Sequence, residues 1–137
     1  MKKIVIDTNV LVAALRSSQG TSYKLLRLLA SESNPFKIQV SVPLVAEYDE
    51  VLARHFPNMQ TSDIVDYLCK IAEHHKIFYL WRPVLKDADD DFILELAVKS
   101  HSYIITWNIK DFVMAKKFGI HVMSPKQLLN LAEKIDE

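Results

Sequence analysis

Short runs of β-branched and other apolar residues alternate along the chain with longer segments in which apolar residues recur every three or four positions. The short runs predict strands at 3–6, 38–42, 76–80, 103–106 and 120–122. The longer segments predict helices at about 9–15, 22–32, 43–55, 61–75, 90–101, 110–117 and 125–134. This alternation is typical of an α/β fold in which a mostly parallel sheet of four to five strands carries helices on both faces.

Length and composition agree with a single domain over residues 1–137. Half of the 137 residues are hydrophobic, which suffices for one core and is short for two. The lone Cys69 excludes an internal disulfide framework, so we expect a reduced, cytoplasmic protein. Asp7 interrupts the first apolar run too early for a signal peptide, and no later stretch approaches the ~20 apolar residues of a membrane span. We therefore expect no membrane segment.

The first predicted strand is followed by three polar residues in the sequence "IVIDTNVLVAAL". An ionised Asp7 between two apolar elements is costly to desolvate unless another group pairs with it. One interpretation is helix capping, because Asp7, Thr8 and Asn9 can each accept hydrogen bonds from the first turn of the following helix. The other is that Asp7 is a ligand at the carboxyl end of a parallel strand, where open α/β sheets place their sites.

Carboxylates also follow three of the other predicted strands. Glu47 follows "IQVSVPL", the acids Asp89, Asp90 and Asp91 lie in "KDADDDFILELAV", and Asn108 and Asp111 lie in "YIITWNIKDF". Each alone could be a solvated charge or could stabilise the start of a helix. Together at one edge of a sheet they would repel one another unless a cation neutralised them, and a cluster of oxygen ligands suits Mg²⁺ or Mn²⁺.

Histidines do not compete with these carboxylates for a metal. His74 and His75 are adjacent, so on the helix predicted at 61–75 they would point about 100° apart and could not share a zinc ion. The remaining histidines have no second ligand at metal spacing, and we interpret them as structural or solvated: His55, His101 and His121. Trp107 lies beside the candidate site and is interpreted as a wall of the cleft rather than as a base-stacking platform.

Four segments, taken in order, resemble the PIN domain: "IVIDTNVLVAAL", "SVPLVAEYDEVLARHF", "DADDDFILELA" and "YIITWNIKDF". The match runs from residue 3 to about residue 125, and it is to the small prokaryotic branch related to the VapC toxins of toxin–antitoxin pairs in particular. The resemblance implies a three-layer α/β/α sandwich and a ribonuclease that depends on a divalent metal such as Mg²⁺ or Mn²⁺. It also implies a small antitoxin protein as partner and the formation of a homodimer.

The resemblance further assigns roles to individual residues. It implies that the metal ligands and catalytic acids are Asp7, Glu47, Asp91 and Asp111. Supporting roles are expected for Thr8, Asn9, Thr106, Asn108, Asp89 and Asp90. The spacing from Leu94 and Ala97 places Asp91 off the core face of its helix and favours it over its two acidic neighbours, either of which could cap the helix.

One departure from the family pattern concerns residues 106–108. Many members of this branch carry Thr-Gly-Asp where the chain has Thr106, Trp107 and Asn108, so one acid of the motif is an amide here. We therefore interpret Asp111, three residues after Asn108, as the acid that remains.

Charge and hydrophobic surface bear on the partners. The chain has 17 basic and 17 acidic residues, which argues against RNA binding by bulk charge. The contacts to RNA are therefore expected to be local, and the candidates are Arg16, Arg54 and Lys110, with Lys24 and Arg27 as further basic residues. A homodimer is expected through the apolar helices at 22–32 and 61–75, with Cys69 near or under that surface.

Other functions fit the residues less well. A phospho-receiver domain would need a lysine after a later strand, a pattern that the chain does not show clearly. A haloacid-dehalogenase phosphatase would need a second aspartate at position 9, where Asn9 stands. A flap-type nuclease would need long insertions, for which the chain has no room. A catalytically silent module that binds RNA or protein stays open as the alternative, although the complete set of acids argues against it.

Overall fold

The computed structural model describes residues 2–77 and 88–136. Its strands are β1 (Lys2–Ile6), β2 (Phe36–Ser41), β3 (Glu73–His75), β4 (Tyr103–Ile105) and β5 (Val122–Met123). Its α-helices are α1 (Thr8–Arg16), α2 (Thr21–Leu29), α3 (Val42–His55), α4 (Thr61–Ile71), α5 (Ala88–Ser100) and α6 (Pro125–Asp136). The 3-10 helix η1 (Ile109–Phe118) lies between β4 and β5.

The five strands in the described part of the chain form one parallel sheet in the order β3-β2-β1-β4-β5. β1 is central, and beside it in β4 Tyr103 lies opposite Ile4 and Ile105 lies opposite Ile6. Ile4, Val5 and Ile6 are buried, as expected for a parallel strand that is covered on both faces. This sheet confirms the α/β fold class that the sequence predicts.

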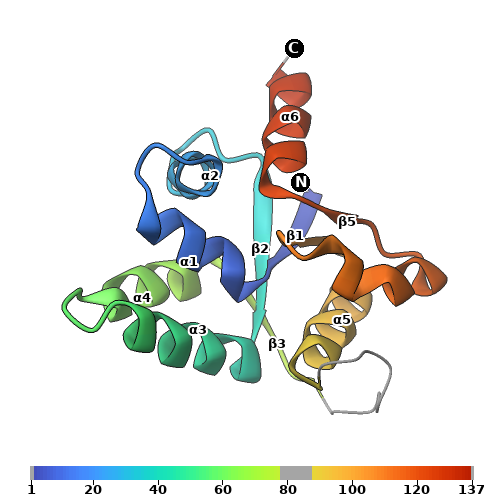
Figure 1. Cartoon of the computed structure of the whole chain (residues 1–137). Coiled ribbons are helices and arrows are strands. Elements are labelled where there is room, and N and C mark those ends of the chain that lie inside the picture. Colours follow the sequence, from blue (N-terminus) through green and yellow to red (C-terminus); the bar gives the residue numbers. More distant parts are fainter. Residues whose placement is uncertain (1, 78–87, 137) are drawn as a thin grey trace.

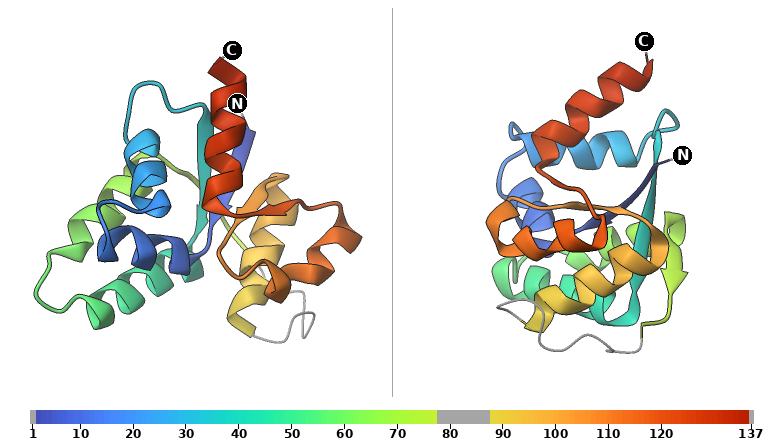
Figure 2. Two further views of the ribbon diagram at one scale, coloured as in Figure 1. Left: turned by 45° about the horizontal axis from the view of Figure 1, so that its top comes forward. Right: turned by 90° about the vertical axis from the view of Figure 1, so that its right-hand side faces the viewer.

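Helices cover both faces of the sheet, so the fold has three layers. α1, α2, α3 and α4 lie on one face, and α5 and η1 lie on the other (Figure 1, Figure 2). Right-handed crossovers explain this division, because the chain passes from β1 through β2 to β3 in one direction and from β3 to β4 and β5 in the other. α6 packs against α2.

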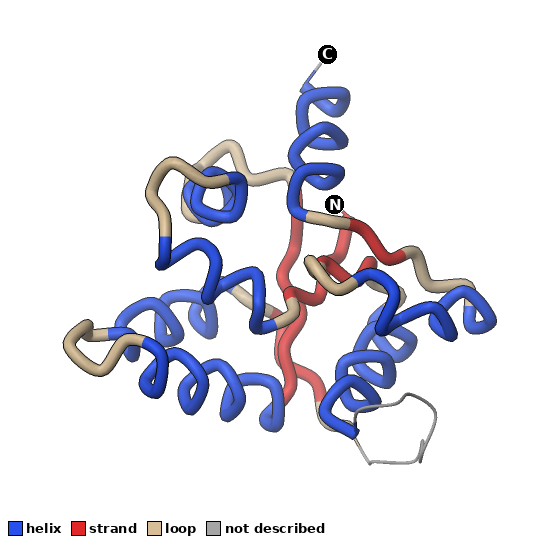
Figure 3. Tube along the Cα trace, viewed as in Figure 1, coloured by secondary structure: helices blue, strands red, loops and turns tan. Residues whose placement is uncertain are grey.

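The order in which strands are added to the sheet reverses between the neighbouring parallel strands β1 and β4. After β1, the single residue Asp7 leads into α1 on one face, and after β4 the chain turns toward η1 on the other face. The connections at this edge are short, since β2 also passes directly into α3 (Figure 3). Open α/β sheets bind their ligands at the carboxyl ends of the strands at such a switch point. The residues that follow β1 and β4 are therefore the place where the fold predicts a site.

The fourth predicted helix is shorter in the structure than its apolar pattern indicates. The helix predicted at 61–75 ends at Ile71, and the last three residues of that range form β3. The side chain of Gln39, buried in β2, bonds to the side chains of both Glu73 and His75. Polar pairs thus hold this edge strand in place, and for that reason it leaves no apolar signal in the sequence.

The other boundaries differ by a few residues. Of the strand predicted at 76–80, residues 76–77 are not in a strand and residues 78–80 lie outside the described residues. The last strand begins at Val122 instead of residue 120. The segment predicted as a helix at 110–117 is the 3-10 helix η1, which ends at Phe118. Gly119 follows it with a φ of 74°, a left-handed conformation that favours glycine. No helix within residues 2–77 and 88–136 is both long and apolar enough to cross a membrane.

Candidate functional site

Asp7 lies at the switch point with its carboxylate held in one orientation. The residue is 8% exposed, and Asp7 Oδ2 accepts hydrogen bonds from Thr106 Oγ1 at 2.8 Å and from Asn9 Nδ2 at 3.3 Å. Asp7 occupies the N-cap position of α1, but its side chain makes no capping hydrogen bond. The first of the two interpretations of Asp7, capping by its side chain, is therefore wrong. The carboxylate instead accepts a hydrogen bond from Thr106, the residue that follows β4.

The Thr106 hydroxyl group sets which atoms donate and which accept in these hydrogen bonds. Its hydroxyl oxygen accepts hydrogen bonds from Asn9 Nδ2 at 3.2 Å and from the backbone N–H of Asn108 at 3.0 Å. A hydroxyl has one proton to donate and two lone pairs, so with both lone pairs in use the Thr106 proton points to Asp7. Thr106 is fully buried, which keeps water from competing for these bonds. A carboxylate fixed in this way is prepared for binding a cation or a substrate.

Asn9 joins the ends of the two strands from the first turn of α1. Its amide nitrogen donates to Asp7 and Thr106, and its Oδ1 accepts a hydrogen bond from the Trp107 backbone N–H at 3.3 Å. The donor end of the amide faces two oxygens and the acceptor end faces an N–H, so the network selects one orientation of the amide. The structure thus brings together Asp7, Asn9 and Thr106, which the sequence predicts from motifs almost 100 residues apart.

α3 brings Glu47 to the same edge of the sheet. Thr8 Oγ1 donates a hydrogen bond to Glu47 Oε2, and the neighbouring Tyr48 donates its hydroxyl proton to the Ile6 carbonyl. Burial raises the pKa of Tyr48 well above its usual value, and the negative charges of Asp7 and Glu47 raise it further. Tyr48 therefore stays neutral and ties α3 to the end of β1. Both carboxylates lie within electrostatic reach of its hydroxyl group.

α5 contributes two buried carboxylates. Asp91 and Glu95 are each 7% exposed and lie one helical turn apart, so they share one side of the helix. α5 is the crossover from β3 to β4 and returns across the sheet antiparallel to the strands. Its first turn, which holds Asp91, consequently lies at the carboxyl edge of the sheet, where α1 and α3 also begin (Figure 1).

The burial of α5 differs from the sequence prediction. The spacing predicts Asp91 off the core face, but α5 packs against β1, β2, β4, α3 and η1, and the whole segment 93–97 is buried with it. A helix covered so widely has no clear polar face, so periodicity understates its burial. For the same reason Glu95 is not among the candidate site residues predicted from the sequence. The one feature of the sequence that could have indicated it is the presence of an acid inside an apolar run. Asp90 is half-buried, and the side chain of Asp89 lies outside the described residues.

The start of η1 forms an exposed rim beside these buried acids. Asn108, Lys110 and Asp111 are all exposed and follow β4 directly. The Asp111 backbone N–H donates to the Asn108 carbonyl at 3.0 Å, which closes a tight turn. Asp111 therefore faces solvent, unlike Asp7 and Asp91.

Two predicted RNA-binding residues lie away from this edge. Arg16 ends α1 and Arg54 lies in the last turn of α3, and both helices begin at the carboxyl edge of the sheet. At about 1.5 Å per residue, each arginine is more than about 10 Å along its helix from that edge. Arg16 bonds to His55 at 3.2 Å, and Arg54 forms an exposed ion pair with Glu50 at 3.9 Å. Of the three predicted RNA contacts, Lys110 alone lies next to the site.

The donor set fits a hydrated Mg²⁺ ion better than a closed metal cage. In the described part of the chain, no group of three or more carboxylate, imidazole or thiolate side chains is placed to hold a metal ion. The site is therefore more open than the four-acid cluster that the sequence predicts. Mg²⁺ does not need such a cluster, because it keeps several waters and is usually bound by one or two carboxylates together with substrate phosphates. Asp7 offers a hard oxygen ligand that Thr106 and Asn9 already orient.

Comparison with known proteins shows which family the chain resembles in sequence and which structures it resembles in fold. The family model described as PIN domain matches residues 3–110. In fold, the chain is similar to a chain in the crystal structure of VapBC2 from Rickettsia felis, which was solved bound to a DNA fragment from the VapBC2 promoter. The two chains are 18% identical and superpose with a TM-score of 0.63, and the match covers 89% of this chain and 98% of that chain. This chain is also similar to VapBC-1 from nontypeable Haemophilus influenzae, with 16% identity and a TM-score of 0.59 over 90% of this chain and 98% of that chain. No curated protein sequence matches the chain.

Proposed function

The chain belongs to the PIN domain family, and on this premise we propose that it is a divalent-metal-dependent endoribonuclease and the toxin of a toxin–antitoxin pair. The observation that supports the nuclease most is the buried Asp7 carboxylate, which Thr106 and Asn9 hold at the switch point of the sheet. The toxin role is supported by the fold that the chain shares with the two VapBC structures.

In this proposal Asp7 and Asp91 hold the metal, and Glu47 and Asp111 reach it directly or through water. When bound, Mg²⁺ or Mn²⁺ supplies an acidified water and charge neutralisation for the hydrolysis of a phosphodiester. The Thr106 hydroxyl group donates a hydrogen bond to Asp7, and the Thr8 hydroxyl group donates one to Glu47. These two hydroxyl groups therefore hold the side chains of the acids in position for the metal.

The only thiol of the chain is not suited to act as the nucleophile. Cys69 lies in α4 and is half-buried. Burial raises the pKa of its thiol, and the negative charges of Asp49 and Asp66 raise it further. Because the thiolate is the nucleophilic form, a raised pKa lowers its reactivity. A water molecule, rather than a side chain, is therefore the attacking group in the proposed reaction.

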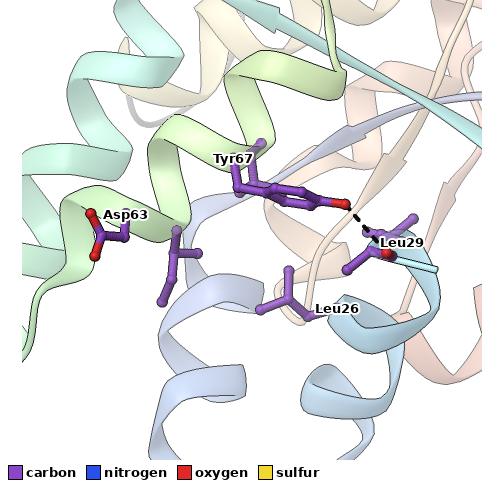
Figure 4. Close-up of a pocket in the computed structure, with 7 residues that line it drawn as sticks. Leu26, Leu29, Asp63 and Tyr67 are labelled. Carbon is purple, nitrogen blue, oxygen red and sulfur yellow. Dashed lines mark hydrogen bonds between the residues drawn. The ribbon is translucent and has the colours of Figure 1, made fainter.

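The proposal also includes a homodimer and a small antitoxin as partners. An apolar groove of about 270 Å³ lies between α2 and α4, the helices through which the sequence predicts the dimer, and it is lined by Leu26, Leu29, Ala30, Ile64, Tyr67 and Leu68. Figure 4 shows Tyr67 beside this groove, where its hydroxyl donates to the Ala30 carbonyl at 3.3 Å. We expect light scattering to give twice the monomer mass. A monomer at high micromolar concentration would remove the dimer from the proposal.

Cleavage of RNA by the purified chain tests the proposed activity. We expect mixed single-stranded and structured RNAs to be cut in millimolar Mg²⁺ or Mn²⁺ and to stay intact in excess chelator, because the acids alone cannot neutralise a phosphodiester. Restoring the metal should restore cleavage in the same sample. Cleavage that chelator leaves unchanged would contradict metal dependence. Intact RNA with every divalent ion would favour the silent binding module.

A further inference from the structure

Trp107 lies against the Asp7 network, yet the reaction proposed above gives its side chain no role. It directly follows Thr106, and its backbone N–H donates to Asn9 Oδ1 at 3.3 Å. Its side chain is large and apolar, and the residue is 43% exposed. Single exposed apolar residues are common on protein surfaces, so exposure by itself assigns no function.

The indole ring is fixed at its polar edge. Trp107 Nε1 donates a hydrogen bond to Ser22 Oγ at 2.8 Å. Ser22 lies in the first turn of α2 and is 4% exposed, so the acceptor is itself held in the protein interior. With the indole N–H in use, the surface that the ring leaves to solvent is hydrocarbon. The ring therefore has a fixed position and an open apolar surface at the same time.

A fixed and exposed aromatic ring beside a site for phosphodiester cleavage suits a nucleobase. Stacking needs an accessible ring, and a ring that is already fixed loses little conformational entropy when a ligand binds. The charge balance agrees, because a chain with no net charge must hold RNA through local contacts. Lys110 is exposed three residues further along the chain, where it can meet a phosphate of the same strand.

We propose that Trp107 stacks on a base adjacent to the cleaved phosphodiester. This inference rests on the proposed nuclease function and adds to it a residue that contacts the substrate. A base inside a duplex is stacked on its neighbours on both sides, so it has no free face for Trp107. The base that Trp107 contacts is therefore an unpaired one.

Steady-state cleavage of a short single-stranded RNA tests the stacking. Trp107→Ala should lower kcat/KM by about 10-fold, chiefly through KM, since the ring contacts a base and not the reacting atoms. An RNA that lacks the base next to the cleaved bond should lower kcat/KM of the parent by the same factor. The same RNA should lower kcat/KM of Trp107→Ala only slightly, because that variant has no ring to stack on the base. Trp107→Phe, which keeps a ring, should retain most of the activity. Val113→Ala, which shortens an exposed apolar side chain on the neighbouring helix η1, serves as the matched control and should leave kcat/KM unchanged.

The outcomes separate this inference from the nuclease proposal. If the parent cuts RNA and the losses from Trp107→Ala and from the missing base add up in full, Trp107 does not stack on that base. Binding gives a second readout that needs no cleavage: in Trp81→Phe, Trp107 is the sole tryptophan, and a single-stranded RNA oligonucleotide added in excess chelator, where no cleavage is expected, should quench its fluorescence. If the parent cuts no RNA, the proposed nuclease activity is wrong, and the fluorescence measurement then tests only whether Trp107 stacks on a base. Fluorescence that the oligonucleotide leaves unchanged would overturn the stacking.

Discussion

Asp7→Asn is expected to lower the rate of RNA cleavage at saturating Mg²⁺ by at least about 100-fold, the order of effect of removing one preorganised charged or polar group from a catalytic site. The substitution keeps the shape of the side chain and still offers an oxygen to the Thr106 hydroxyl, so the network at the end of β1 can persist. It deletes the negative charge that the proposed metal requires. The fold should therefore survive while activity is lost.

The matched control for this substitution is Asp49→Asn. Asp49 is exposed on α3, two residues after Glu47, so the change removes the same charge without touching the site. Its cleavage rate should equal that of the parent. Thermal melts should show Asp7→Asn at the parent temperature or above, because an amide is less costly to bury than a carboxylate. Asp7→Asn with a rate within threefold of the parent would exclude Asp7 from the chemistry.

Asp91→Asn is expected to change the response of stability to metal more than stability itself. In chelator it should melt at the same or a higher temperature than the parent, because it removes one of two buried acids a single turn apart on α5. Addition of Mg²⁺ at about ten times its Kd should stabilise the parent by about 1.4 kcal/mol, or about 5 °C for a chain of this size. The variant should gain much less, because a ligand stabilises only the state that binds it.

A purely structural role for Asp91 predicts the opposite pattern of melts. Loss of a favourable acid from the first turn of α5 would then destabilise the variant by up to about 1 kcal/mol in chelator. The variant would also respond to Mg²⁺ as fully as the parent. That combination would remove Asp91 from the metal site and shift the assignment to Asp89 or Asp90. The two accounts predict different changes in the melting temperature of Asp91→Asn in chelator and in its response to Mg²⁺, so thermal melts with and without metal separate them.

The central strand and its polar end follow directly from the sequence. Ile4–Ile6 form an unbroken apolar run because β1 is covered on both faces, and Asp7 ends the run where the strand meets the edge of the sheet. Carboxyl ends of parallel strands share an edge, so the sequence predicted Asp7 and Thr106 at the same edge of the sheet, and the pairing of β1 with β4 brings them together. The alternation of short apolar runs with longer helical segments was likewise sufficient to predict the α/β fold class.

The details that the sequence could not supply depend on side-chain partners far apart in the chain. Thr8 bonds to Glu47 because α3 packs beside α1, and no local pattern indicates this pairing. The indole of Trp107 bonds to Ser22, 85 residues earlier, so the sequence alone could not show that the ring has a fixed position. Glu95 was hidden because α5 is buried around most of its circumference.

The central claim is that the carboxylates at the switch point bind a divalent cation. Electron paramagnetic resonance of free Mn²⁺ in a titration with the purified chain measures this binding directly, without RNA and without cleavage. We expect the parent to bind Mn²⁺, excess Mg²⁺ to displace it, and Asp7→Asn to weaken the binding by at least about 10-fold, while Asp49→Asn binds as the parent does. A parent that binds no Mn²⁺ at millimolar concentration, or an Asp7→Asn variant that binds it as tightly as the parent, would contradict the account.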